Sequence, residues 1–177
     1  MATGLANDYY LKALDCYPWY LSDFLEAINY ALSYDENHAD AHCLFGRFYM
    51  EQLSKYSDAT YHFEQALAAD MNNIPTYYAY IRLTIQTDDH SKARKLLKFA
   101  GTIPGVDKSY LKHLEALILE KEGHFKNSKK KLKELLNEET CNWVREYIKK
   151  ELNRIKEKQK KASKSKKSKK KKKKNKK

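Results

Sequence analysis

The sequence has little of the two residues that most often interrupt helices, with five glycines and three prolines in 177 residues. A turn-rich β fold is therefore disfavoured, because such folds need these residues at frequent intervals. Apolar residues make up 42% of the chain and include 14 tyrosines, which is enough to bury a core. Composition and length thus favour a helical protein with one domain.

Cysteine and long apolar runs are also scarce. Cys16, Cys43 and Cys141 lie far apart and form no C-x-x-C pair, so we expect neither a disulfide framework nor a cysteine zinc site. No stretch reaches 18 consecutive apolar residues, and residues 1–10 lack the basic start and apolar run of a signal peptide. We therefore expect no transmembrane helix and a cytoplasmic protein, or a nuclear one if the source is eukaryotic.

The net charge of +12 is unevenly distributed along the chain. Residues 156–177 contain 15 lysines and a single acid, Glu157, so this stretch carries +14 and the remainder carries −2. Electrostatic attraction to anionic partners is therefore predicted for the C-terminal tail rather than for the body.

A pattern of apolar or small residues recurs about every 34 or 35 residues, which a single helix with a period of 3.6 residues does not explain. Five columns keep their register through four copies. The columns are Tyr10, Leu14, Phe24, Ile28 and Ala31; Phe45, Tyr49, Ala59, Phe63 and Ala66; Ala79, Leu83, Ala93, Leu97 and Ala100; and Leu114, Ile118, Ser128, Leu132 and Leu135.

Polar turns divide each copy and separate it from the next. Turns within copies are predicted at residues 15–18, 54–56, 87–90 and 121–124, and turns between copies at 35–37, 70–73, 103–105 and 137–139. Proline, glycine, aspartate and serine concentrate there, as turn chemistry requires. Each copy is therefore predicted to form two antiparallel helices, which bury their apolar faces only when the copies stack.

The copy from residue 41 to residue 73 resembles the tetratricopeptide repeat family. The residues that carry the resemblance are Phe45, Gly46, Tyr49, Ala59, Phe63 and Ala66. The gap between Tyr49 and Ala59 is one residue longer than is usual in the family, and Met71 replaces a proline. The resemblance implies an all-α, solenoid-like stack of about four helix–turn–helix repeats over residues 1–138.

The C-terminal residues are expected to form two further regions. Residues 139–160 are predicted to be a capping helix, with Trp143, Tyr147 and Ile148 on one side, because a repeat array must close its last apolar face. Residues 161–177 contain lysine and serine with almost no apolar residue. They are predicted to be disordered, since they cannot bury enough surface to offset the loss of chain entropy.

By the resemblance, the first helix of each pair lines a concave groove that holds a protein partner. The groove positions are Asp8, Lys12, Cys43, Arg47, Tyr77, Ile81, Lys112 and Ala116. The asparagines of a family clamp for C-terminal carboxylates are missing, so we assign no clamp. Asp8 and Lys12 are also compatible with an ordinary i,i+4 ion pair. The predicted ligand is an extended peptide or a single helix.

The lysine tail is predicted to attract polyanions through Lys164, Lys166, Lys167, Lys169, Lys170, Lys171, Lys172, Lys173 and Lys174. Nucleic acid binding through phosphates, attraction to an anionic membrane and an appendage without a dedicated partner all fit this composition. Because the tail has no aromatic residue to stack on bases, it is not expected to recognise a base sequence.

Motifs for catalysis are missing from the sequence. There is no glycine-rich phosphate loop, no G-x-S-x-G and no H-E-x-x-H. His38 and His42 lie four residues apart, but His42 occupies an apolar column and is predicted to be a packed histidine rather than a metal ligand. We therefore predict no enzymatic activity, no metal and no cofactor.

The predicted function is a protein–protein interaction scaffold or adaptor. It binds a peptide or helix in its groove, and its tail adds electrostatic attachment to polyanions. Two alternatives remain open at this point: a nucleic-acid- or ribosome-associated protein bound mainly through the tail, and an assembly chaperone.

Overall fold

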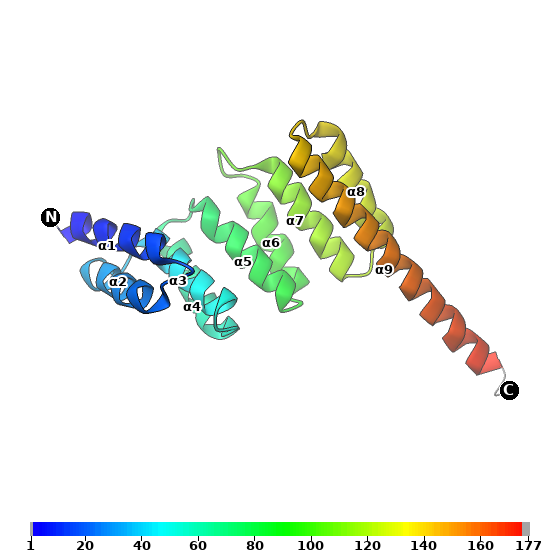
Figure 1. Cartoon of the computed structure of the whole chain (residues 1–177), viewed down its shortest axis with the longest axis horizontal. Coiled ribbons are helices and arrows are strands. Elements are labelled where there is room, and N and C mark those ends of the chain that lie inside the picture. The colour runs from blue at the N-terminus through cyan, green and yellow to red at the C-terminus, as the bar shows by residue number, and fades with distance from the viewer. Residues whose placement is uncertain (1, 175–177) are drawn as a thin grey trace. The chain divides into compact units, whose positions relative to one another are not determined.

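A computed structural model describes residues 2–174 of the chain, with side chains described for residues 4–163. Every regular element within these residues is an α-helix (Figure 1). The predicted all-α class is therefore confirmed.

The helices form consecutive antiparallel pairs, and each pair packs more closely within itself than against its neighbours. The pairs are α1 (Ala2–Cys16) with α2 (Leu21–Tyr34), α3 (Ala39–Glu51) with α4 (Tyr56–Ala69), α5 (Ile74–Gln86) with α6 (His90–Ala100), and α7 (Lys108–Lys121) with α8 (Phe125–Glu138). A further helix, α9 (Asn142–Lys174), follows the fourth pair. All eight predicted turns coincide with breaks between these helices.

Polar side chains define the start of several helices. His38, Asn73, Asp89 and Asp107 each accept a hydrogen bond from a backbone N–H in the first turn of the helix that follows. These bonds satisfy donors that the helix itself leaves unpaired. Pro75 lies in the first turn of α5, where its missing N–H costs little.

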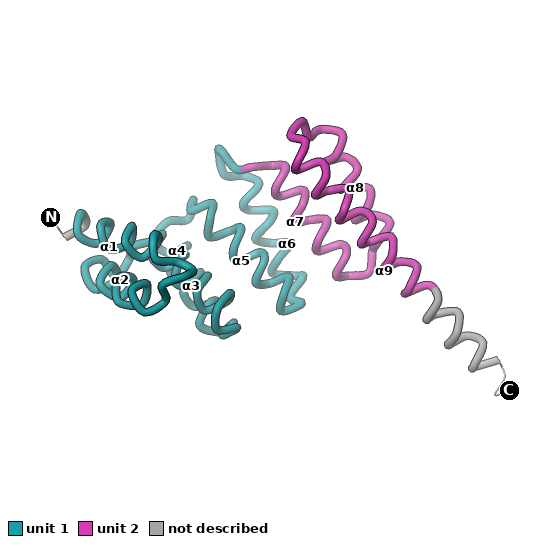
Figure 2. Tube along the Cα trace, in the orientation of Figure 1, with its two compact units in different colours: residues 1–106 teal, residues 107–177 magenta. Residues whose placement is uncertain are grey.

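The chain divides into two compact units, residues 1–106 and residues 107–177 (Figure 2). The first unit contains three helix pairs, and the second contains the fourth pair with α9. These units differ from the predicted domains, which are a repeat region of residues 1–138, a capping helix and a tail. The predicted domains rest on the sequence pattern and stay a prediction.

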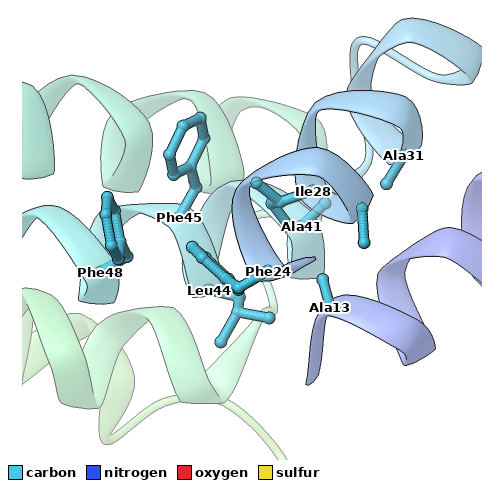
Figure 3. Close-up of a cluster of buried hydrophobic side chains, with 9 residues drawn as sticks. Ala13, Phe24, Ile28, Ala31, Ala41, Leu44, Phe45 and Phe48 are labelled. Atoms are coloured by element: carbon cyan, nitrogen blue, oxygen red, sulfur yellow. The ribbon is translucent and has the colours of Figure 1, made fainter. Parts of the chain in front are cut away.

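The core of the first unit begins with apolar side chains from α1, α2 and α3. Ala13, Phe24, Ile28, Leu44 and Phe48 are among its buried members (Figure 3). Phe24 is completely buried, and its ring centroid lies 5.0 Å from that of Phe48. The first helix pair is thus attached to α3 by two residues of the repeat columns, Phe24 and Ile28, and by neighbours of the columns such as Leu44 and Phe48.

The small residues of the repeat allow the two helices of a pair to approach closely. Ala59, Ala93 and Ser128 occupy equivalent columns in three different pairs, and each is completely buried. A Cβ atom at Gly46 would lie 2.7 Å from Cε1 of Phe63, so this close approach requires glycine. The column of Ala59, Ala93 and Ser128 therefore corresponds to a buried contact point in successive pairs, whereas Leu14, in a column of the first helices, is 40% exposed.

The second unit contains a separate apolar cluster. Leu132 and Leu135 of α8 pack with Ile148, Leu152 and Ile155 of α9, and all five are buried. Figure 1 shows α7, α8 and α9 side by side, in agreement with the contacts between α7 and α8 and between α8 and α9. Ile148, Leu152 and Ile155 are thus buried on the predicted side of α9, whereas Trp143 and Tyr147, predicted on the same side, are 72% and 43% exposed. The role of α9 as a cap stays a prediction.

Helix α9 ends at Lys174, beyond residue 160 where the sequence placed the end of the helix. Lysine has a high helix propensity, which favours continuation of the helix. The side chains of residues 164–177 lie outside the described ones. The predicted disorder of residues 161–177 therefore stays a prediction.

Candidate functional site

The structure separates the predicted groove residues by exposure. Asp8 and Lys12 on α1 are exposed, and the side chain of Arg47 on α3 is 39% exposed. Cys43 on α3 and Tyr77 and Ile81 on α5 are all buried in the first unit. These three side chains offer a partner little surface. Asp8, Lys12 and Arg47 are thus the groove residues of this unit that a ligand can reach.

Two predicted groove residues belong to the second unit. Lys112 on α7 is partly buried, and its Nζ lies 2.5 Å from Oε2 of Glu138 on α8. Ala116 is buried against α8 and α9. The Lys112 ammonium therefore has a structural partner, and Ala116 belongs to the core.

Arg47 belongs to a cluster with Tyr17 and Glu51. Its guanidinium lies 5.3 Å from the ring centroid of Tyr17, and its Nε lies 3.4 Å from Oε1 of Glu51. The Tyr17 hydroxyl donates to Oε2 of Glu51 over 2.6 Å. Burial, together with this hydrogen bond, raises the pKa of Tyr17 to about 12. The cluster therefore holds an arginine and a carboxylate in fixed positions beside an aromatic ring.

A second group extends the same surface along α3. Asp40 accepts a hydrogen bond of 2.7 Å from Nδ2 of Asn73. Tyr10 of α1 is half-buried near Asp40, and burial raises the pKa of its hydroxyl, with the Asp40 charge adding to the effect. Burial also raises the pKa of the Cys43 thiol, which keeps this cysteine protonated and poorly nucleophilic.

We refer to Tyr10, Tyr17, Asp40, Arg47 and Glu51 as the α1–α3 surface. It combines aromatic rings with charges of both signs on adjacent elements, the composition that suits recognition of a polypeptide. Glu51 lies four residues after Arg47, so their pairing follows ordinary helix geometry. The position of the Tyr17 side chain depends on the turn after α1. The repeat pattern does not predict this position, because Tyr17 lies outside the repeat columns.

His38 and His42 have structural partners. Nδ1 of His38 accepts from the backbone N–H of Ala41 over 3.2 Å, so this side chain caps α3. His42 is buried, which agrees with its predicted packing, and its Nε2 lies 2.9 Å from the carbonyl oxygen of Glu36. Nδ1 of His42 lies 2.9 Å from Nδ1 of His62 on α4. The sequence did not indicate this contact between two histidines.

Searches of the described residues for two other kinds of site were negative. No cluster of three or more histidine, cysteine, aspartate or glutamate side chains suited to a metal ion occurs in this part of the chain. None of the helices there combines the length and apolarity needed to cross a membrane. The predicted polyanion-binding lysines, Lys164 to Lys174, lie outside the described side chains.

Comparison with known proteins identifies the repeat. Residues 52–118 match the family model described as tetratricopeptide repeat. The fold is similar to a solved structure from a functional characterization of Pseudomonas aeruginosa PilF, with a TM-score of 0.75 and 16% identity over 90% of this chain and 71% of that chain. No curated protein matches the sequence significantly. Residues 52–118 thus contain tetratricopeptide repeat sequence, in agreement with the family resemblance stated above.

Proposed function

We propose that this tetratricopeptide repeat protein is an interaction adaptor that binds a peptide or a single helix on its α1–α3 surface. Tetratricopeptide repeats generally mediate protein–protein interactions. The observation that carries the more specific proposal is the Tyr17–Arg47–Glu51 cluster, which presents a partly exposed arginine on the first helix of a pair.

The cluster favours a partner with a hydrogen-bonding or acidic group near an apolar side chain. Arg47 has five N–H donors, and its Nε contacts Glu51. A carboxylate or carbonyl of a peptide can accept from the remaining donors, while the Tyr17 ring offers apolar contact. Lys12 adds a second exposed cation on α1. Asp8 and Asp40 on the same helices would disfavour a strongly acidic partner, so we propose a peptide of mixed character.

The proposed function is tested by comparing partner capture by the full chain with capture by two point variants. Arg47→Glu reverses the charge of the α1–α3 surface. Arg82→Glu makes the same change at an exposed position on α5 and serves as the matched control. We expect Arg47→Glu to lose a partner that the wild type and Arg82→Glu both retain. Equal capture by both variants would count against this surface.

A second candidate function is nucleic-acid or ribosome association through the tail, favoured by the 15 lysines of residues 156–177. The two candidates differ in salt dependence, because binding to phosphates weakens steeply as salt rises. The structure shows where a tail truncation must fall. Ile155 is buried and Lys158 pairs with Glu120, so the chain should be cut after Ser163.

Partner capture that survives both this truncation and high salt supports the α1–α3 surface. Capture that requires the tail and disappears in high salt supports the tail. Neither function requires catalysis, and we propose that the protein has no enzymatic activity of its own.

A further inference from the structure

The lysines of α8 fall into two groups. Nζ of Lys129 lies 2.6 Å from Oε1 of Gln159 on α9, and Nζ of Lys131 lies 3.0 Å from Oε2 of Glu115 on α7. Both side chains are partly buried and connect α8 to its neighbours. Lys126, Lys130 and Lys133 are exposed, and each lacks an ion-pair partner within the described residues. The helix thus directs two lysines inward and three toward solvent.

The three outward lysines form a line along α8. Their spacing of four and then three residues places them on one helix face, spanning about 10 Å. Asn127 is exposed next to Lys126. We refer to Lys126, Asn127, Lys130 and Lys133 as the α8 stripe. Because its cations form no ion pair within the described residues, although Glu134 lies four residues after Lys130, their charge is available to an external anion.

A surface pocket connects this stripe with the base of the lysine tail. Its volume is about 430 Å³, and its lining includes Lys126 and Asn127 of α8 together with Gln159 and Ser163 of α9. Ser163 directly precedes Lys164, the first of the predicted polyanion-binding lysines. The tail therefore begins beside the positive end of the stripe. The N-terminus of α8 lies at this end of the stripe, where the helix dipole adds positive potential and the Glu122 carboxylate, 3.3 Å from Nδ1 of His124, offsets part of it.

Charge in the body is also segregated along the chain. Residues 1–106 contain 13 acidic and eight basic residues, whereas residues 107–155 contain nine acidic and twelve basic residues. The near-neutral body inferred from composition is therefore the average of an acidic part and a basic part. Attraction to a polyanion is thus expected from the folded second unit as well as from the tail.

We propose that the α8 stripe is a nucleic-acid-binding surface that contacts the phosphate backbone. Lysines bind phosphates as point charges, and an exposed asparagine can donate to a phosphate oxygen. A membrane is a less suitable partner, because no large apolar side chain of α8 is exposed to enter a bilayer. None of the four residues of the stripe is aromatic, and contacts to phosphates carry no sequence information, so we expect binding to be independent of base sequence.

This inference goes beyond the function proposed above. It assigns binding to the folded part of the second unit, whereas the adaptor proposal concerns the α1–α3 surface and the second candidate concerns the tail. If the α8 stripe does not bind nucleic acid, both of those proposals still stand. The experiments below distinguish binding by the three regions.

The first test maps protected lysines in the full chain with a single-stranded oligothymidylate of about 20 nucleotides as the probe. Lysines are acetylated with and without the probe, and the chain is cleaved at glutamate. Cleavage after Glu122 and Glu134 releases residues 123–134, which contain all five lysines of α8. We expect the probe to reduce acetylation several-fold at Lys126, Lys130 and Lys133. Protection confined to the tail would overturn the proposal.

The second test measures affinity over a range of salt concentrations. The triple variant Lys126→Gln, Lys130→Gln and Lys133→Gln removes three phosphate contacts from the stripe. Because a contact to a single strand contributes about 0.7 to the salt slope, the slope should fall by about 2. Binding at 0.15 M salt should weaken at least about tenfold.

The matched control for the triple variant replaces three exposed lysines of the first unit by glutamine. Lys55, Lys95 and Lys98 are suitable, since all three are exposed and the net charge changes equally. We expect the control to retain nearly the full salt slope. Equal slopes for the two triple variants would overturn the proposal, because net charge alone would then explain binding.

The same proteins should be tested with vesicles containing phosphatidylserine and for self-association. The proposal is supported if the stripe variant loses oligothymidylate binding while circular dichroism shows an intact fold. It is overturned if the stripe lysines are needed only for vesicle binding. It is equally overturned if they are needed only to pair with the acidic first unit of another copy.

Discussion

The contact between His42 and His62 predicts a loss of stability in mild acid. Nε2 of His42 lies against a carbonyl oxygen, which only accepts, so Nε2 carries a proton. In the neutral pair, Nδ1 of His62 then donates to Nδ1 of His42 over 2.9 Å. Protonation of His62 keeps this hydrogen bond but places a positive charge on a partly buried ring, which costs free energy.

The direction of the pH effect follows from the pKa of His62. Burial, followed by the charge of His42, lowers this pKa from 6.5 to about 4, although Asp58 opposes the change. Since the unfolded chain binds the proton more readily, the stabilisation is complete above pH 6.5 and is lost as the pH falls toward 4. The full shift corresponds to about 3 kcal/mol. Because His62 is only partly buried, solvent screening reduces this to about 1–2 kcal/mol.

The prediction is tested with His62→Gln, which keeps an N–H donor for His42 but does not titrate. His124→Gln is the control, because this histidine is exposed. The free energy of unfolding is measured by urea denaturation at about pH 7.5 and pH 5. Wild type and His124→Gln should lose about 1 kcal/mol more between these pH values than His62→Gln loses. An equal loss in all three proteins would refute the assigned role of His62.

Three further predictions concern packing and charge, and each is measured by chemical denaturation. Gly46→Ala should destabilise the chain by about 1–3 kcal/mol, because the new Cβ meets the Phe63 ring and the overpacking outweighs the gain in helix propensity; a stabilised variant would contradict this. Phe24→Ala should cost about 3–5 kcal/mol through loss of a fully buried ring, and a cost below about 1 kcal/mol would show that the core collapses around the gap. Glu120→Gln should lower the free energy of unfolding by about 2 kcal/mol, because it weakens the pairing with Arg154. An unchanged free energy of unfolding would show that this ion pair does not stabilise the fold.

The periodic part of the fold could be predicted from the sequence. The columns containing Ala59, Phe63 and Ala66 are buried as expected, and the polar turns separate the helices. Periodicity is informative here because each helix pair has nearly the same core contacts as the next. Gly46 identifies the family for the same reason, since the position against Phe63 has no room for a side chain.

The candidate site could be predicted only in part, because exposure depends on contacts between successive pairs. The family resemblance places Cys43, Tyr77 and Ile81 on the groove side of their helices, yet all three are buried. The Thr76 hydroxyl, which is also buried, donates to Oδ1 of Asn73 over 2.7 Å. The Tyr77 hydroxyl donates to the carbonyl oxygen of Met71. Burial of the three groove residues follows from how closely two pairs approach, which residue types alone do not determine.

The histidine contact and the Arg47 cluster were missed for a related reason. His42 and His62 lie on different helices of one pair, and their registers must match for the two Nδ1 atoms to meet. Tyr17 lies in a turn outside the repeat columns, so the periodic pattern contained no information about its direction. Side-chain pairs that occur in a single copy of the repeat are thus the least predictable part of the site.

The basic residues of α9 that stabilise the fold can be distinguished from those available to bind a polyanion, because they have different partners. Glu120 on α7 is almost fully buried and accepts from Arg154 and from Lys158. Although burial opposes ionisation, these hydrogen bonds lower the pKa of Glu120. An external polyanion must compete with this buried carboxylate for both cations, whereas the exposed lysines of the α8 stripe are available without such competition. The positive charge counted from residue 156 onward therefore overstates what a ligand can use. Cutting the chain after Ser163 should remove the tail's share of electrostatic attachment, while leaving the α8 stripe, the Glu120 cluster and the fold of the second unit intact.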